Sequence, residues 1–347
     1  MITNLNAPFP YAGGKSTVAQ DVWNALGNPK HYIEPFFGSG AVLLQRPNYN
    51  PQTMVETVND ADGHICNVWR ALQGDPDAVA KVCDFPVNHA DLMARKKVLN
   101  ANTERLLENL VADPEWYDAK LAGYWIWSAC CSIGTGLICP NQIPHLTGAG
   151  MGVHALGKRP HLANAGRGVH ALGKRPHLAN AGRGVHKPSL SEQSTAVVKD
   201  VREPYNTPIY DWFRRLSERL RNVRVVCGDW TRVCGGNWQD KMGTVGIFFD
   251  PPYGTEATRD LGIYAVDSLT VAGDVRRWCL ERGDKPSYRI VLAGYYEEHE
   301  ELLKLGWTHK KWKASGGYAN TGNGQGKVNR FREALFFSPY CLKQGLF

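Results

Sequence analysis

Residues Glu34–Gly40 read EPFFGSG and follow a short apolar run, so a strand predicted over 31–35 ends in a glycine-rich turn. In an open α/β sheet, ligands bind outside the carboxyl ends of the strands, and glycines there let the backbone approach a ligand closely. Two glycines alone are weak evidence. About 20 residues later, however, a second predicted strand (54–58) ends in Asn59-Asp60, where an acidic side chain typically accepts hydrogen bonds from a ribose. The simpler interpretation of Asp60 is a helix N-cap.

The same alternation of strands and helices extends outward to both ends of the chain. Helical segments are predicted over 41–44, from 65 to 72 and from about 207 to 221. Further strands are predicted over 223–226, 245–249, 289–292 and 333–337. This pattern indicates an α/β fold with a mostly parallel sheet. Residues from about 75 to 199 break the alternation, so we predict an inserted domain there.

The strand predicted over Val245–Phe249 leads directly into Asp250-Pro251-Pro252-Tyr253. The prolines fix φ and have no backbone N–H, so the neighbouring carbonyl lacks a local donor. The segment therefore presents a carboxylate oxygen and a carbonyl oxygen beside an aromatic ring. This arrangement suits an exocyclic amino group on a flat ring, although a turn without a ligand can also contain two prolines.

A second glycine-rich stretch, PFPYAGGKST at Pro8–Thr17, ends like a Walker loop. Such a loop needs a glycine five residues before Gly14 and a buried strand in front of it. This chain has Phe9 at that position, and the prolines on either side of Phe9 disfavour a strand. We therefore reject a nucleotide hydrolase. A cofactor loop and an unliganded turn before a helix from about Ser16 both remain possible interpretations.

The composition indicates a folded, aromatic-rich protein. Hydrophobic residues make up 43% of the 347 residues, and there are 11 Trp, 14 Tyr and 11 Phe. The length suits about two domains. There is no apolar run of about 18 residues and no signal-peptide pattern, so we expect neither a membrane span nor export. Nine cysteines without a C-x-x-C pair indicate reduced thiols rather than disulfides or zinc ligands.

The formal charge of +7 comes from one segment. Between Ala119 and Ser191 there are eight Lys or Arg and no Asp or Glu, whereas the rest of the chain has 32 basic and 33 acidic residues. Such asymmetry indicates a polyanionic partner, most simply nucleic acid. A solvated basic loop without a partner is the alternative.

The basic segment also contains a perfect tandem repeat. Residues 152–167 read GVHALGKRPHLANAGR, and residues 168–183 read the same again. A solenoid needs at least three units with an apolar face, so we interpret the repeat as a loop lengthened by duplication. Its histidines are evenly spaced because the unit is repeated, and without nearby cysteines they predict no metal site.

In this order, the motifs resemble those of the Dam-type class of DNA adenine methyltransferases of bacteria and phages. PFPYAGGK resembles the N-terminal cofactor motif of that family, EPFFGSG its S-adenosylmethionine loop and DPPY its catalytic motif. The stretch NVRVVCGDW (222–230) resembles the strand whose terminal acidic residue lies near the adenine of the cofactor. The resemblance implies a Rossmann-like S-adenosylmethionine-dependent methyltransferase sheet in residues 1–75 and 200–347. It implies an inserted DNA-recognition domain in residues 76–199.

The resemblance also implies roles for individual residues. The catalytic residues are expected to be Asp250, Pro251, Pro252 and Tyr253. The cofactor-binding residues are expected to be Tyr11, Lys15, Glu34, Pro35, Phe36, Gly38, Gly40, Asp60, Asp229 and Trp230. The DNA-binding residues are expected to be Lys158, Arg159, Arg167, Lys174, Arg175 and Arg183. DNA is the expected partner, with no metal, no membrane and no obligatory protein partner, and the expected location is the cytoplasm of a bacterial or phage-infected cell.

The implied reaction moves a methyl group from S-adenosylmethionine to N6 of adenine in DNA. Asp250 and the Pro251 carbonyl would each accept one N–H, so that the nitrogen lone pair points at the methyl group. Catalysis would rest on positioning and electrostatics, without a covalent enzyme intermediate. The target base must leave the duplex to reach the site, where Tyr253 would stack on it.

Several alternatives remain open. Cytosine-N4 methylation uses the same geometry, more commonly with serine in place of Asp250. Methylation of RNA or of a protein amide is more distant, and the latter generally has asparagine there. A protein of another class, a non-catalytic nucleic-acid binder on the same fold, is also compatible with the basic segment.

Overall fold

The computed structural model describes residues 5–11, 13–87, 89–131, 208–252, 270–312 and 332–342. The chain divides into two compact units. One, which we call the sheet unit, comprises Met1–Leu5, Ala12–Ala61 and Asn222–Phe347. The other, the helical unit, comprises Asn6–Tyr11 and Asp62–Arg221.

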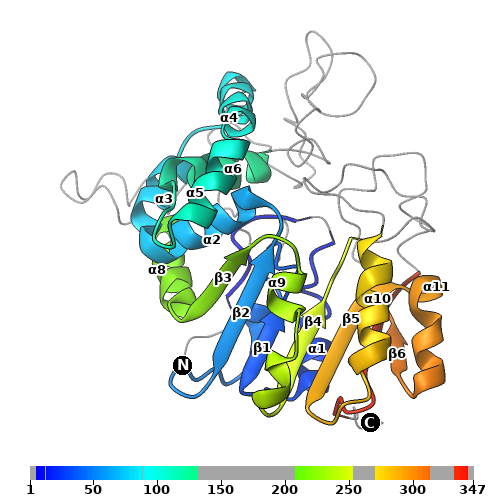
Figure 1. Ribbon diagram of the computed structural model, residues 1–347. Coiled ribbons are helices and arrows are strands. Elements are labelled where there is room, and N and C mark those ends of the chain that lie inside the picture. Colours follow the sequence, from blue (N-terminus) through cyan, green and yellow to red (C-terminus); the bar gives the residue numbers. More distant parts are fainter. Residues whose placement is uncertain are drawn as a thin grey trace, which may run out of the picture. The chain divides into compact units, whose positions relative to one another are not determined.

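The sheet unit is built on a seven-stranded sheet with the order β3-β2-β1-β4-β5-β7-β6 (Figure 1). The strands are β1 (His31–Glu34), β2 (Val55–Asp60), β3 (Val223–Cys227), β4 (Val245–Phe249), β5 (Tyr288–Tyr295), β6 (Thr308–Lys311) and β7 (Glu333–Phe337). The first five are parallel, and β7 is antiparallel to both β5 and β6. The predicted α/β fold with a mostly parallel sheet is confirmed.

The strand order reverses at β1. The chain runs outward from β1 through β2 to β3, and β4 then pairs with the opposite side of β1. In open α/β sheets, ligands bind at the carboxyl ends of the strands at such a reversal. Because β1 leads into the EPFFGSG turn and β4 leads into Asp250, the fold brings the two motifs to this position.

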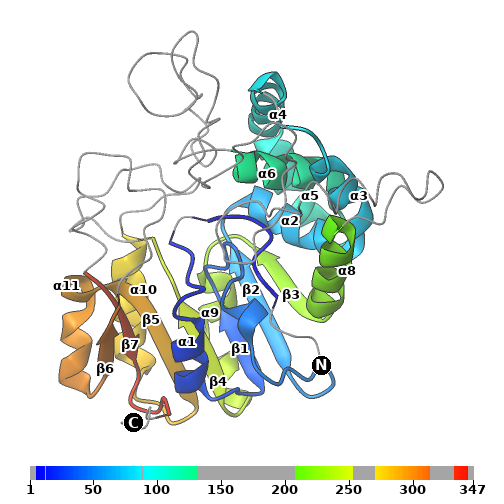
Figure 2. The same cartoon turned by 180° about the vertical axis from the view of Figure 1, so that it is seen from behind.

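Helices cover both faces of this sheet, as the two opposite views show (Figures 1 and 2). Helix α1 (Ala19–Leu26) covers one face, and α9 (Thr231–Cys234) and α10 (Val271–Arg282) cover the other. Short helices complete the unit: η1 (Leu43–Gln45), η2 (Trp238–Lys241), α11 (Tyr296–His299) and η3 (Glu300–Leu305). Alternate residues of β4 and β5, among them Ile247, Phe249 and Leu292, pack with Trp278 of α10 in a buried core.

Two elements differ from the sequence prediction. The helix predicted over 41–44 is only the single turn η1, because Arg46 precedes Pro47 and takes the extended conformation (φ −59°, ψ 122°) that proline imposes on its predecessor. Strand β6 was not predicted. Its residues, THKK, are all exposed at the edge of the sheet, so they carry no apolar pattern that marks a strand.

The helical unit contains the helices α2 (Gly63–Gly74), α3 (Pro76–Cys83), α4 (His89–Ala101), α5 (Thr103–Ala112), α6 (Ala119–Cys131) and α8 (Pro208–Leu220). Helix α6 packs against α2, α3 and α4, and it buries Trp125, Ile126 and Trp127. Helices α2 and α8 flank the predicted insertion in sequence and cluster with this unit. The boundaries 75/76 and 199/200, and the role of an inserted recognition domain, stay predictions. The repeat at 152–183 lies outside the described residues.

Candidate active site at the carboxyl ends of β1 and β4

The turn after β1 has a backbone that only glycine adopts readily. Gly38 and Gly40 have φ values of 48° and 65°, in the left-handed region. The Gly40 N–H donates to the Phe37 carbonyl at 2.8 Å, and the Phe37 N–H donates to the Asn59 carbonyl at 2.9 Å. The two glycines therefore give the turn its tight shape against the end of β2.

Two side chains at the end of β2 hold this turn in place. Asp60 Oδ2 accepts a hydrogen bond from the Gly38 N–H at 2.8 Å. The buried Asn59 donates from Nδ2 to the carbonyls of Pro35 (3.0 Å) and Gly228 (2.9 Å). Asn59 thus ties together the segments that follow β1 and β3.

The N-cap interpretation of Asp60 is wrong. The N-cap of α2 is Asp62, whose carboxylate accepts the His64 N–H at 2.8 Å. Asp60 instead accepts a hydrogen bond from the glycine turn. The Asp60 carboxylate lies at the edge of the sheet where the ribose-binding acid of a Rossmann-like fold lies.

Asp250 lies at the carboxyl end of β4 and forms an ion pair with Lys15. Lys15 Nζ is 2.8 Å from Asp250 Oδ1, and the two side chains are 3% and 21% exposed. Lys15 Nζ also donates to the Gly13 carbonyl at 2.7 Å, and Gly13 has a φ of 74°. Burial raises the pKa of the Asp250 carboxyl, and the charge and hydrogen bond of Lys15 oppose that shift. The lysine of the Walker-like stretch therefore holds a carboxylate of its own chain.

Aromatic rings pack below the same edge. The Trp230 ring lies 6.4 Å from Phe36 and 5.9 Å from Phe249, measured between centroids. Trp230 is buried and Phe36 is half-buried, so both join the glycine turn to the core. Asp229 is exposed, and its Oδ1 accepts the N–H and the hydroxyl of Thr231.

The structure brings most, but not all, of the predicted site residues to this edge. Pro251 is buried and Pro252 half-buried beside Asp250. Tyr11 belongs to the helical unit, where its ring meets Phe9 edge-on at 6.3 Å. Tyr253 and the six basic residues of the repeat lie outside the described residues. The individual roles assigned from the sequence stay predictions.

Two further residues near the site were not singled out from the sequence. Trp312 follows β6, and the centroid of its ring is 5.9 Å from Lys15 Nζ. Arg46 follows η1 and forms a buried ion pair with Glu56 at 3.1 Å. No local pattern marks either residue, because their partners lie elsewhere in the sequence.

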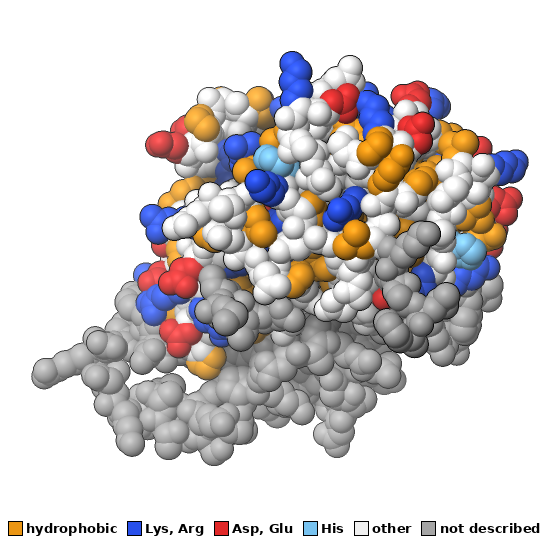
Figure 3. All heavy atoms as spheres, turned by 90° about the horizontal axis from the view of Figure 1, so that it is seen from below, with side chains coloured by type: hydrophobic (Ala, Val, Ile, Leu, Met, Phe, Trp, Pro, Cys, Tyr) orange, Lys and Arg blue, Asp and Glu red, His pale blue; other side chains and the backbone are white. Residues whose placement is uncertain are grey.

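The lower face of the molecule in Figure 1, seen from below in Figure 3, shows a mixed surface. Lys and Arg side chains alternate there with Asp, Glu and apolar side chains. The described residues on this face therefore form no broad basic patch, and the excess charge of the chain belongs to segment 119–191.

The strand order, the glycine turn after β1 and the carboxylate after β4 define a Rossmann-like methyltransferase fold. A family model described as D12 class N6 adenine-specific DNA methyltransferase matches residues 11–111. This match confirms the resemblance to Dam-type enzymes, and the protein is accordingly an enzyme of the DNA methyltransferase class. The match includes Lys15, the glycine turn and Asp60, and it ends before Asp229 and Asp250. None of the curated proteins matches the chain.

Proposed function

We propose that the protein transfers a methyl group from S-adenosylmethionine to N6 of adenine in DNA, with the target base flipped out of the duplex. The observation that carries this proposal is the position of Asp250. Its carboxylate lies at the reversal of the strand order, beside the glycine turn of β1, and it is held by Lys15 at 2.8 Å. The match of residues 11–111 to an adenine-specific family favours adenine as the target.

The residues at the end of β1 and β2 fit an adenosine-containing cofactor. Gly38 and Gly40 have no side chain and a left-handed backbone, so the turn leaves room for a ligand to approach. Asp60 provides carboxylate oxygens for a ribose, and Asp229 with Trp230 would lie near the adenine. Glu34, Pro35, Phe36 and Lys15 would complete the site within the sheet unit, and the role of Tyr11 stays a prediction from the sequence. When bound, S-adenosylmethionine would supply an electrophilic methyl group on a sulfonium sulfur.

Asp250 would accept a hydrogen bond from the exocyclic amino group of the target base. This role needs an ionised carboxylate, and burial alone disfavours ionisation. The Lys15 ammonium favours the ionised form of the Asp250 carboxylate, because it is almost fully buried and 2.8 Å from Asp250 Oδ1. The Pro251 carbonyl would accept the second N–H, and Tyr253 would stack on the base.

DNA would be held outside the site by the basic residues of the repeat, Lys158, Arg159, Arg167, Lys174, Arg175 and Arg183. Their charges support this role, because segment 119–191 contains no acidic residue. A base inside a duplex cannot reach Asp250, so flipping is part of the proposal.

The proposal is tested by methyl transfer in solution. Purified protein is incubated with duplex DNA and methyl-labelled S-adenosylmethionine, and the DNA is digested to nucleosides for mass spectrometry. We expect label in N6-methyladenine, none with Asp250→Ala, and normal labelling with the exposed control Asp274→Ala. Label in N4-methylcytosine would show that the target base is cytosine instead of adenine. The absence of any labelled nucleoside, with wild-type protein that is folded, would overturn the proposal.

A further inference from the structure

Glu34 is a buried carboxyl group directly before the glycine turn. It is 2% exposed, and its Oε2 accepts the Tyr32 hydroxyl at 2.9 Å. The backbone N–H of Leu43 donates a second hydrogen bond to the Glu34 carboxylate. Tyr32 is itself fully buried, so water does not replace its hydroxyl as the donor.

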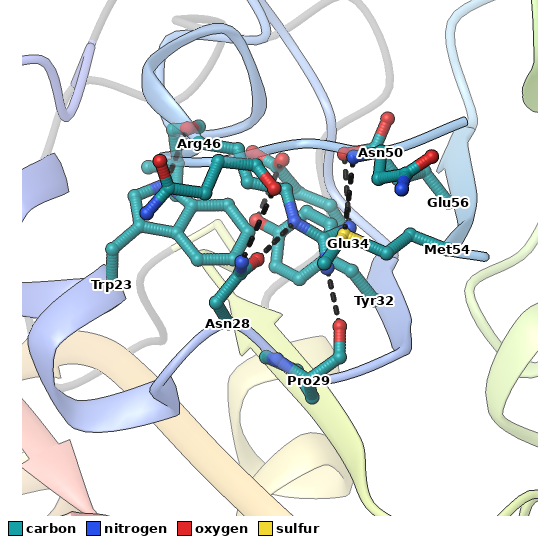
Figure 4. A network of polar contacts seen from close by, with 11 residues as sticks. Trp23, Asn28, Pro29, Tyr32, Glu34, Arg46, Asn50, Met54 and Glu56 are labelled. Atoms are coloured by element: carbon teal, nitrogen blue, oxygen red, sulfur yellow. Dashed lines mark hydrogen bonds and ion pairs between the residues drawn. The ribbon is translucent and has the colours of Figure 1, made fainter. Parts of the chain in front are cut away.

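The guanidinium group of Arg46 is not an ion-pair partner of Glu34. Arg46 forms its ion pair with Glu56, and both side chains are fully buried. Its Nε also donates to Asn28 Oδ1 at 2.9 Å, and its Nη2 donates to the Pro29 carbonyl. Figure 4 shows Arg46 held among these partners, with Tyr32 and Glu34 beside them. Arg46 therefore joins the start of β2 to the chain that precedes β1.

The other charged groups that act on Glu34 in the described part of the chain are negative, and no positive group there offsets them. Asp250 and Glu56 both act on Glu34 as negative charges, and Lys15 pairs with Asp250. Among the described residues, no Lys or Arg forms an ion pair with Glu34. Burial is the largest influence and raises the pKa of Glu34 well above its usual value, with Asp250 and Glu56 adding to the rise. The hydrogen bonds from Tyr32 and Leu43 lower it.

We propose that Glu34 gives up its proton when the positively charged cofactor binds, and that Tyr32 is a positioning residue that stabilises the ionised carboxylate. The proposal rests on the proposed function, because S-adenosylmethionine carries a sulfonium and an ammonium group. A positive charge beside a buried carboxyl group favours its ionised form. The free protein would hold the proton, and the complex would release it.

Proton release couples cofactor affinity to pH. A ligand that prefers the ionised carboxyl binds more tightly as pH rises, until the group is already ionised in the free protein. Removing the Tyr32 hydroxyl raises the pKa of Glu34 further, because a bond that favours the charged form is lost. Tyr32→Phe should therefore weaken binding below the plateau by roughly 10-fold, as for a lost hydrogen bond to a charged group, and move the plateau to higher pH.

The test is isothermal titration calorimetry of S-adenosylmethionine into the full-length protein, in phosphate and in Tris, over a range of pH. The dependence of the heat on the buffer gives the protons exchanged. We expect the wild type to release up to about one proton more than Glu34→Gln. That variant retains the proton exchange of the other groups, among them the cofactor's own amino group, whose pKa is about 8.

A matched control separates positioning from a general loss of packing. Tyr288 on β5 also donates its hydroxyl to a carboxylate, that of Asp240, at the opposite end of its strand from the site. Tyr288→Phe should leave the pH dependence of cofactor affinity unchanged. Equal pH profiles for Tyr32→Phe and wild type, or equal proton release by wild type and Glu34→Gln, would overturn the inference. If the wild type binds no S-adenosylmethionine, both the proposed cofactor and this inference are wrong. If the wild type methylates DNA normally but releases as many protons as Glu34→Gln, only this inference is wrong.

Discussion

At the scale of single residues, Asp250 must satisfy two opposing conditions. Burial raises the pKa of the Asp250 carboxyl, whereas its proposed role as acceptor of an amino N–H needs the ionised form. Lys15 opposes the effect of burial on Asp250, because its buried ammonium group lies 2.8 Å from the carboxylate and favours the ionised form. An ion pair in this environment is strong enough to hold the carboxylate in one orientation.

Replacement of Asp250 by alanine should abolish most of the turnover while leaving cofactor binding nearly intact. A lost hydrogen-bond partner of the transition state costs roughly 10²-fold or more in turnover. Steady-state methylation kinetics measure this loss, and calorimetry with S-adenosylmethionine measures affinity. Near-normal methyl transfer by Asp250→Ala would remove Asp250 from catalysis.

Changes in the glycine turn should act on the cofactor instead. Gly40→Leu places a side chain on a left-handed backbone, and Asp60→Ala removes both the acceptor of the Gly38 N–H and the predicted ribose acceptor. We expect weaker S-adenosylmethionine binding in both variants by calorimetry. Gly273→Leu is the control, because a side chain there meets nothing within 4 Å. Unchanged affinity in both turn variants would place the cofactor elsewhere.

At the scale of elements, the sequence predicted the strands that have an apolar pattern and missed the one that lacks it. Strands β1–β5 and β7 are buried on at least part of their length, and all six were predicted. Strand β6 is polar and exposed, and among the described strands it lies at the edge of the sheet, next to β7. The glycine turn was predicted from local spacing. The ion pair of Lys15 with Asp250 was not, since a contact between residues so far apart in sequence follows only from the strand order.

The segment around η1 depends on Arg46 rather than on a regular helix. Arg46 packs its guanidinium over the rings of Trp23 (5.2 Å) and Tyr49 (5.6 Å) while it pairs with Glu56. Without a helix of normal length after the glycine turn, these contacts fix the path of the chain from β1 to β2. The structural role of Arg46 could not be predicted from the sequence, because nothing there distinguishes it from any other charged residue before a proline.

Replacement of Arg46 by methionine should strongly destabilise the sheet unit. Removing Arg46 leaves the fully buried Glu56 carboxylate without its ion-pair partner on Arg46, and breaking a buried ion pair costs about 3–5 kcal/mol. Arg105→Ala is the control, since its pair with Asp118 is exposed and worth at most about 1 kcal/mol. Urea unfolding gives both free energies. A loss for Arg46→Met no larger than the loss for Arg105→Ala would contradict the structural role of this network.

At the scale of the whole molecule, the uneven distribution of charge along the chain is the main evidence for where DNA binds. The excess positive charge lies in 119–191, whereas the remainder of the chain is nearly neutral. Methyl transfer to DNA needs both a site for one base and a hold on the surrounding phosphates. We assign the first requirement to the sheet unit and the second to the basic segment.

Deletion of one repeat unit, 168–183, tests this assignment. It removes three basic residues, Lys174, Arg175 and Arg183, and none of the motif residues. Shortening a loop changes closure entropy only logarithmically, so we expect a folded protein that binds cofactor normally. Its DNA affinity should fall, and the slope of log affinity against log salt, about −0.9 for each neutralised phosphate, should become shallower. Equal slopes for the full-length and shortened proteins would show that the repeat contributes no phosphate contacts.

The most direct test of adenine methylation is sequencing of modified bases in DNA from a methylation-deficient bacterial host that expresses the protein. We predict N6-methyladenine in the host DNA with the wild-type protein and its absence with Asp250→Ala at the same level of folded protein. Host DNA without N6-methyladenine despite folded wild-type protein, or equal N6-methyladenine with both proteins, would contradict the account.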